Sequence, residues 1–174
     1  MMQSQVAEVI KRFMRAYPQG VSIATTTYDN KPWGLTVSSF TSISLDPPLI
    51  MVSIGKGTKS HDAFIGSNNL AVNLLSVGQE VLADAFAGKV PQERRFDFVE
   101  YRIGKSGAPI LNAASGYLDC KKWRVYEAGD HSIILGEVID GDVSGIPYPL
   151  VYHNRKYTTV ATAYVESVFA PDFW

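Results

Sequence analysis

Apolar residues recur every three or four positions near the N-terminus, at Val6, Val9, Ile10, Phe13, Met14 and Tyr17. This spacing is typical of one face of an amphipathic helix, and it predicts a helix over about 4–17. Ser4 is placed to act as the N-cap, and Pro18 with Gly20 would end the helix. The sequence therefore predicts one N-terminal helix ahead of a region with a different pattern.

Beyond this helix, the apolar positions fall in short runs of strand length. Extended segments are predicted over 21–27, 34–48, 49–54, 70–75, 99–103, 116–126, 131–141, 150–152 and 156–160. The apolar run 49–54 is predicted to be buried on both faces. Short helices are predicted over 61–65 and 79–86, and 89–98 is predicted to be a charged loop. About eight short strands with three small helices favour a mainly β protein and a closed barrel over a doubly wound parallel sheet.

Small hydroxyl residues alternate with apolar ones in the segment 34–48, which suggests an extended chain with unlike faces. Three hydroxyls are expected on one face, at Thr36, Ser38 and Ser42. Three apolar side chains are expected to pack on the other, at Val37, Phe40 and Ile43. Paired serines fit a strand interior poorly, but hydroxyls and free amides can hold a flat polar ring. A polar edge strand that ends at Asp46-Pro47-Pro48 explains the segment equally well.

Composition narrows the class of protein. With 174 residues the chain is expected to form a single domain over 1–174, and 46% apolar against 19% charged residues support a real core. Sixteen basic and seventeen acidic residues give a net charge of −1, which argues against nucleic acid as a partner. A signal peptide and an apolar run long enough for a bilayer are both missing. These features predict a cytoplasmic protein with no membrane association.

Cysteine and histidine usage argues against a metal site. Cys120 is the only cysteine, so no intrachain disulfide is expected, and in an apolar strand its thiol should be inert. The three histidines lack metal-ligand spacing. His61 is predicted to face solvent in the first turn of a short helix. His131 follows Gly129-Asp130 at a hairpin tip, where a polar residue can be functional or can be a solvated turn residue.

The segment 55–60, Gly-Lys-Gly-Thr-Lys-Ser, links a strand to a short helix. Its two glycines allow close approach of the backbone, and free amides with Lys59 would attract an anion such as a phosphate monoester. The spacing is not that of a Walker loop. An ordinary N-cap by Thr58 or Ser60 is the alternative explanation.

Six short motifs occur in a fixed order: Thr36-x-Ser38-Ser39-Phe40, Ser44-Leu45-Asp46-Pro47-Pro48-Leu49, Thr58-Lys59-Ser60, Phe86-Ala87-Gly88, Gly129-Asp130-His131 and Pro149-Leu150-Val151-Tyr152-His153. Each is weak alone, but together they resemble the short-chain flavin reductase family over about 13–157. One departure is that the family's usual Ser-x-Thr before the helix is Thr58-x-Ser60 here. The resemblance implies a Greek-key-like, FMN-binding split β-barrel that forms a homodimer.

The resemblance also implies roles for individual residues. The isoalloxazine of FMN, or of FAD, would lie against Thr36, Val37, Ser38 and Ser39. The ribityl chain would run beside Ser53, Ile54 and Gly55, and the phosphate would be held by Thr58, Lys59 and Ser60. The flavin would be covered by Phe86, Ala87 and Gly88. The nicotinamide nucleotide would meet Asp130 and His131, with Arg95 and Phe96 as further candidates or solvated loop residues. No catalytic side chain is expected, because hydride passes between two cofactors.

The function implied is an NAD(P)H-dependent flavin reductase, which uses NADH or NADPH. It would supply reduced flavin to a partner monooxygenase, or electrons to another acceptor such as a cobalt corrin. Two alternatives share the barrel: a non-catalytic FMN-binding electron carrier or sensor, and an oxidase like the pyridoxamine-phosphate oxidases. The C-terminal tail, 161–174, is outside the motif series. Its aromatic residues are expected to pack on the barrel or on a second subunit.

Overall fold

The computed structural model describes residues 2–144 and 148–160 of the chain, so the predicted tail 161–174 lies outside the described residues. The helical elements are α1 (Met2–Ala16), α2 (His61–Gly66), α3 (Glu80–Asp84), a π-helical turn η1 (Ala85–Lys89) and a 3-10 helix η2 (Gln92–Phe98). The strands are β1 (Gln19–Gly20), β2 (Ser22–Tyr28), β3 (Lys31–Val37), β4 (Thr41–Leu45), β5 (Pro48–Gly55), β6 (Asn69–Leu74), β7 (Tyr101–Ile103), β8 (Pro109–Leu111), β9 (Gly116–Ala128), β10 (His131–Val143), β11 (Val151–His153) and β12 (Lys156–Thr158).

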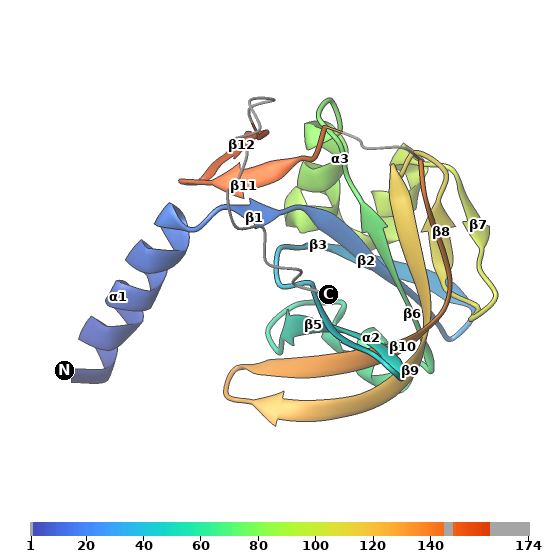
Figure 1. Cartoon of the computed structure of the whole chain (residues 1–174), viewed down its shortest axis with the longest axis horizontal. Helices are drawn as coiled ribbons and strands as arrows, with labels where there is room; N and C mark the ends of the chain where they lie inside the picture. The colour runs from blue at the N-terminus through green and yellow to red at the C-terminus, as the bar shows by residue number, and fades with distance from the viewer. Residues whose placement is uncertain (1, 145–147, 161–174) are drawn as a thin grey trace, which may run out of the picture.

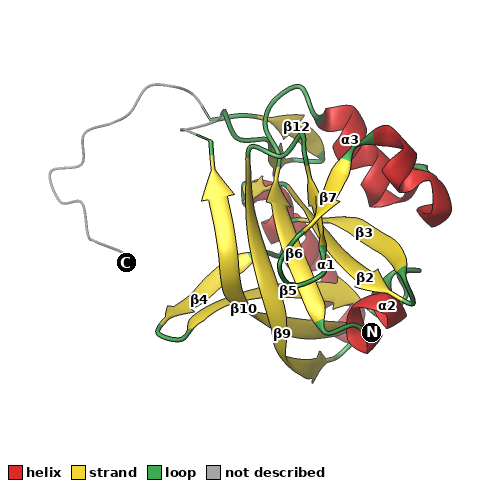
Figure 2. Ribbon diagram, turned by 90° about the vertical axis from the view of Figure 1, so that its right-hand side faces the viewer, coloured by secondary structure: helices red, strands yellow, loops and turns green. Residues whose placement is uncertain are grey.

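Seven strands form one antiparallel sheet in the order β3-β2-β6-β9-β10-β5-β4. The sheet curls round on itself (Figure 1 and Figure 2), and the long hairpin of its strands β9 and β10 extends along the bottom of Figure 1. Smaller sheets, β1-β11-β12 and β7-β8, flank it. The mainly β split barrel is therefore confirmed. The number of strands was underestimated, because β1, β8 and the separate β4 are too short to show a pattern.

Two elements differ from the sequence prediction because their environment decides their form. The strand β5 buries Ile50, Val52 and Ile54 on one face only, so the prediction that 49–54 is buried on both faces was wrong. The expected charged loop 89–98 contains η2, whose residue Arg95 is buried. Periodicity alone cannot identify a short 3-10 helix of this kind.

The segment 34–48 is two strands at opposite edges of the sheet, with a break at 38–40. At this break the hydroxyl of Ser39 donates to the carbonyl of Ser53 (2.9 Å) and accepts from the amide of Ser53 (3.1 Å). The side chain of Ser39 thus takes the place of a backbone hydrogen-bond partner for Ser53 of β5. These two hydrogen bonds join the end of β3 to β5 and close the barrel there. Ser39, the second of the paired serines, therefore has a structural role. Ile43 is exposed, contrary to prediction, because the β4–β5 register shifts between Ser42 and Ser44.

The long strands β9 and β10 bend with two register shifts, one of them between Leu135 and Gly136. A Cβ atom placed on Gly136 would lie 2.9 Å from the Cβ of Cys120, so the two strands approach closely here. Cys120 is fully buried, and burial raises the pKa of its thiol to about 12. The prediction of an inert thiol agrees with this environment.

The helix α1 stands away from the barrel (Figure 1). It begins at Met2, so the prediction of an N-cap at Ser4 was wrong, and Tyr17 follows its end. The apolar face predicted from the sequence is exposed, with Val9 60% and Phe13 69% accessible. Among the described helices, each is too short or too polar to span a membrane.

Candidate functional site

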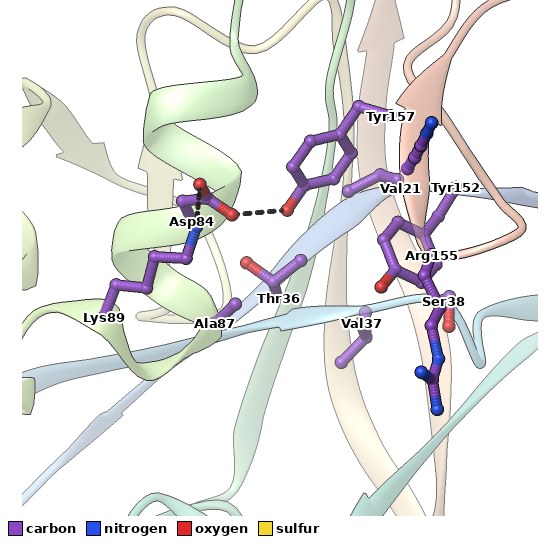
Figure 3. A pocket seen from close by; sticks show the side chains of 11 residues that line it. Val21, Thr36, Val37, Ser38, Asp84, Ala87, Lys89, Tyr152, Arg155 and Tyr157 are labelled. Carbon is purple, nitrogen blue, oxygen red and sulfur yellow. Dashed lines mark hydrogen bonds and ion pairs between the residues drawn. The ribbon is translucent and has the colours of Figure 1, made fainter.

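Two adjacent cavities lie where strand β3 meets the helical turn η1, and both are lined by Thr36 of β3 and Ala87 of η1. We call the first, about 510 Å³ in volume, the hairpin cavity (Figure 3). Its lining is Val21, Thr36, Val37, Ser38, Asp84, Ala87, Lys89, Tyr152, Arg155, Lys156 and Tyr157. We call the second, about 330 Å³, the loop cavity. Its lining is Leu35, Thr36, Thr58, Lys59, Ser60, Phe86, Ala87, Gly88, Val90, Pro91, Gln92 and Arg95.

The loop cavity is built around a buried polar cluster. The side-chain carbonyl of Gln92 accepts from Ser60 Oγ (3.0 Å) and from Arg95 Nη1 (2.8 Å). Arg95 also donates to the carbonyls of Gly34 (2.7 Å) and Val90 (3.2 Å). Burial is the main cause that lowers the pKa of Arg95, although guanidinium groups stay charged in proteins. The amide nitrogen of Gln92 is buried without a partner in the described structure.

The segment 58–60 forms one wall of this cavity. Thr58 Oγ1 donates to the carbonyl of Gly55 (2.9 Å), and no side chain caps the first amides of α2. The N-cap alternative is therefore not supported for either hydroxyl. Lys59 is exposed at the cavity and forms no ion pair within the described residues. Lys59, which has no ion pair among the described residues, and Gln92, whose amide nitrogen is buried without a partner there, therefore both line this cavity.

The opposite wall comes from η1. Phe86 is fully buried and packs so closely on β3 that a Cβ atom on Gly34 would lie 2.7 Å from its ring. Gly88 has φ +106°, a conformation that side chains rarely adopt, and it ends the helical turn beside Ala87. The motif 86–88 thus forms a tight turn against the strand that carries Thr36.

The hairpin cavity holds a different kind of polar group (Figure 3). Tyr157 donates to Asp84 Oδ1 (3.0 Å), and Lys89 forms an ion pair with Asp84 Oδ2. The hydrogen bond from Lys89 is the main cause that lowers the pKa of Asp84, and the bond from Tyr157 adds to it. Burial, followed by the neighbouring Asp84 carboxylate, raises the pKa of Tyr157 to about 12. Near neutral pH, Asp84 is therefore ionised and Tyr157 keeps its proton.

The hydroxyls predicted for the flavin ring are only partly free. Thr36 Oγ1 donates to the carbonyl of Ala83 (2.6 Å), so its oxygen can only accept from a ligand. The hydroxyl of Ser39 is used to close the barrel. Ser38 is exposed and lines the hairpin cavity, while Val37 is buried beneath it. These contacts leave Ser38 as the freest donor of the group.

The hairpin tip after β9 lies beside the loop that precedes α2. His131 pairs with Gly55 across the strands, and the amide of Lys56 donates to the carbonyl of Asp130 (2.9 Å). The imidazole of His131 contacts Asp130 Oδ1 (2.7 Å), and this hydrogen bond is the first cause that lowers the pKa of Asp130. The predicted hairpin-tip position of His131 is confirmed.

His61 was predicted to face solvent, and this was wrong. Its side chain is only 14% exposed, and its Nε2 lies 3.0 Å from Ser132 Oγ. Ser132 is fully buried on β10, next to His131. The contact joins the start of α2 to the base of the hairpin tip. The position of a residue within a helix turn does not reveal a neighbouring strand, which is why this contact was missed.

The structure brings most of the sequence-predicted site residues together. The two cavities contain Thr36, Val37, Ser38, Thr58, Lys59, Ser60, Phe86, Ala87, Gly88 and Arg95. Neither cavity is lined by Ser39, Ser53, Ile54, Gly55, Asp130 or His131. Arg95, predicted as a nicotinamide contact, lies instead with the residues predicted to bind the phosphate.

Several cavity residues were missed from the sequence: Asp84, Lys89, Gln92, Tyr152, Arg155, Lys156 and Tyr157. The sequence held one signal for part of this set, because Tyr152 belongs to a motif of the resemblance and the basic residues Arg155 and Lys156 follow shortly after it. Asp84 and Lys89 gave no signal, since helix side chains of this type are usually solvated. Among the described residues, no group of three or more potential metal ligands occurs.

Comparisons with known proteins agree on one family. A model of the flavin reductase like domain matches residues 14–161. An NADH-dependent FAD reductase of Streptomyces globisporus is 40% identical over 133 residues, which cover 75% of this chain and 72% of the relative. The reductase component of an FADH(2)-dependent resorcinol hydroxylase of Rhizobium sp. (strain MTP-10005) is 32% identical over 160 residues, which cover 91% and 89%. The crystal structure of flavin reductase HpaC complexed with NADP+ has a TM-score of 0.83 and 39% sequence identity, and covers 90% of this chain and 99% of that chain.

Proposed function

The chain belongs to the flavin reductase like domain family, and we propose that it is an NAD(P)H-dependent flavin reductase acting on FMN or FAD. The observation that carries this proposal is the pair of cavities joined at Thr36 and Ala87. One cavity has the groups that suit a phosphate, and the other has a hydroxyl-bearing strand and aromatic side chains. A flavin nucleotide has this same division into an anionic end and a flat ring.

The loop cavity fits the flavin phosphate on the evidence of its own side chains. Lys59 supplies an unpaired charge, and the Gln92 amide nitrogen is a buried donor without a partner among the described residues. A buried donor left unsatisfied is costly, so a phosphate oxygen that accepts from it would stabilise the site. Thr58 and Ser60 lie at the same wall, where each would turn its hydroxyl proton from its present acceptor, Gly55 or Gln92, toward the phosphate. These residues would hold the phosphate.

The strand end Thr36–Ser39 would line the isoalloxazine, with Phe86, Ala87 and Gly88 as its cover. The ribityl chain would pass Ser53, Ile54 and Gly55, which lead from the Ser39 contact toward the loop at 58–60. The backbone of this part is fixed by the Ser39–Ser53 hydrogen bonds, so a ring bound there meets a preorganised wall.

Hydride transfer from the nicotinamide to the flavin is the chemistry that the bound cofactors supply. The protein contributes binding, orientation and the exclusion of water. His131, held by Asp130 at the hairpin tip, would contact the nicotinamide nucleotide, and its strand is tied to the start of α2 through Ser132 and His61. The two nucleotides would thereby be positioned by connected elements, and no side chain acts as a nucleophile or general base.

We also propose a homodimer that supplies reduced flavin to a partner monooxygenase in the cytoplasm. The apolar face of α1 is exposed at Val9, Ile10 and Phe13, and burial of such a face favours association. The monooxygenase partner is supported by the relative that is the reductase component of a hydroxylase. Sedimentation of the wild-type protein beside a Phe13→Asp variant would test the dimer: a wild-type monomer would contradict it.

The function itself is tested by oxidation of NADH and NADPH in the presence of FMN, FAD or riboflavin. We expect protein-dependent oxidation with at least one flavin nucleotide. An electron carrier of the same fold would bind flavin without accelerating nicotinamide oxidation, so flavin binding with no turnover would favour that alternative.

A further inference from the structure

The turn between β11 and β12 has an unusual residue at its second position. Asn154 has φ +47° and Arg155 has φ +62°, so both residues are in the left-handed region. Two-residue turns of this kind favour glycine at the second position, because a side chain there is sterically unfavourable. An arginine in this conformation is therefore a candidate for a role that outweighs the local strain.

The side chain of Arg155 lies on the hairpin cavity, as Figure 3 shows, and on a neighbouring cavity of about 310 Å³. It is exposed and forms no hydrogen bond or ion pair within residues 2–144 and 148–160. The adjacent Lys156 lines the hairpin cavity in the same unpaired state. The carboxylate of the cavity, Asp84, is already satisfied by Lys89 and Tyr157, so it does not neutralise either cation.

The turn is held in place from both sides. The amide of Asn154 donates to the carbonyl of Arg15 at the end of α1 (2.9 Å). The rings of Tyr152 and Tyr157 pack edge to face at a centroid distance of 5.5 Å. The guanidinium of Arg155 is thus carried on a fixed backbone, which lowers the entropic cost of binding an anion.

We propose that Arg155, assisted by Lys156, binds a phosphate of the nicotinamide nucleotide. This inference rests on the proposed function. The phosphate of the flavin is accounted for by the loop cavity at the other end of the site, so two free cations at the hairpin cavity have no partner on FMN. A second ligand with phosphates is required by the reaction, and guanidinium groups bind phosphate oxygens in a bidentate manner.

The phosphate has two possible sources, and kinetics distinguishes them. If Arg155 binds the diphosphate, Arg155→Gly raises the KM for NADH and for NADPH alike, by about tenfold. If it binds the 2′-phosphate, only the KM for NADPH rises. In both cases the dissociation constant for FMN stays the same, and added salt weakens nucleotide binding less in the variant than in the wild type.

The variant has a second readout that does not depend on turnover. Replacing a strained arginine by glycine should leave the thermal midpoint unchanged or higher. Equilibrium titration of the protein with NAD+ and NADP+ should show weaker binding by the same factor as the change in KM. Arg155→Lys keeps the charge and should recover part of the affinity.

Two control variants separate charge from turn geometry. Asn30 has φ +57° at the second position of the β2–β3 turn, so Asn30→Gly makes the same backbone change without removing a cation. Arg124→Ala removes an exposed arginine on β9, outside both cavities. Both controls should keep the wild-type KM. An unchanged KM and unchanged nucleotide binding in Arg155→Gly would overturn the proposal, whereas an inactive wild-type protein would overturn the proposed function instead.

Discussion

The loop cavity and the hairpin cavity share Thr36 and Ala87, and each has an exposed cation beside polar groups that are bonded to one another, but these bonded groups are buried only in the loop cavity. In the loop cavity, Ser60, Gln92 and Arg95 are buried and bonded to one another. In the hairpin cavity, the cations Arg155 and Lys156 are exposed and have no partner in the described residues. The buried cluster of the loop cavity is part of the folded core. The exposed cations of the hairpin cavity add charge to the surface of the protein and are not bonded to the described residues of its core.

This difference indicates that the two cavities have different roles in binding. A preorganised buried cluster suits a ligand that binds tightly and in one orientation. Exposed cations suit a ligand that must arrive and leave in each turnover, because solvent-exposed charges steer association more than they add affinity. We assign the flavin phosphate to the loop cavity and a phosphate of the nicotinamide nucleotide to Arg155 and Lys156 of the hairpin cavity, and each variant below tests one side of this comparison.

The largest effect is expected for Arg95→Leu, which removes the centre of the buried cluster. The carbonyl of Gly34 and the side-chain oxygen of Gln92 would lose donors in a buried position, at a cost of about 2–4 kcal/mol in the free energy of unfolding. Urea denaturation measures the change. Arg94→Leu is the matched control, since Arg94 is exposed and its one ion pair within the described residues is with Asp97, and it should cost under about 1 kcal/mol. Equal effects would mean that the loop cavity is not organised by Arg95.

Lys59→Ala tests the ligand of the loop cavity without disturbing its core. Loss of one charge-assisted bond to a phosphate is worth about 1.5–3 kcal/mol, so the dissociation constant for FMN should rise at least about tenfold. Riboflavin has no phosphate, and its binding should barely change. Lys56→Ala, three residues earlier and outside both cavities, should leave FMN binding as it is. If FMN and riboflavin weaken equally, the phosphate is not bound by Lys59.

A smaller, several-fold effect is expected for His131→Ala at the hairpin tip. The imidazole contact would be lost from the nicotinamide nucleotide only, and one neutral polar contact is worth about 0.5–1.5 kcal/mol. Steady-state kinetics should therefore show a higher KM for NADH, while an FMN titration shows an unchanged dissociation constant. Unchanged kinetics would return His131 to the role of a solvated turn residue.

The smallest effect is expected for Tyr157→Phe, which removes one hydrogen bond to Asp84. Because Tyr157 is partly exposed, the loss should be under about 1 kcal/mol near neutral pH. The folded-state pKa of Tyr157 is raised to about 12 from 10.0, so its contribution is present below 10.0 and is lost as the pH rises toward 12. The folded-state pKa of Asp84 is lowered below 3.8, so its contribution is lost as the pH falls through that lowered value.

Thermal midpoints of the wild type and Tyr157→Phe across this pH range give the measurement. The difference between the two proteins should be widest between the two limits and should narrow at both ends. A difference that stays constant from acid to alkaline pH would show that the hydrogen bond between Tyr157 and Asp84 is not its cause.

The sequence predicted best those parts of the site whose functional residues are neighbours in the chain. The loop cavity is made largely of two short motifs, 58–60 and 86–88, whose glycines and hydroxyls are visible as such. The strands β9 and β10 were also predicted, because their alternation is long. By contrast, the break at 38–40 depends on Ser39 meeting Ser53, a contact that only the closed barrel creates.

The hairpin cavity could not be predicted for the same reason. Asp84, Lys89 and Arg155 come from α3, η1 and a turn near the end of the described chain, and only the fold brings them together. Burial of Arg95 and of His61 was likewise invisible, since each residue looks solvated in its own segment. Side chains whose role depends on a neighbouring element need the three-dimensional structure.

The central claim is that this protein brings a flavin and a nicotinamide nucleotide together for direct hydride transfer. An anaerobic mixture of the protein, one equivalent of FMN or FAD, and NADH deuterated at the transferred position tests it most directly. We expect the visible flavin absorbance to bleach much faster than without protein, and more slowly with the deuterated nucleotide than with ordinary NADH. Bleaching at the same rate with and without the protein would contradict the account.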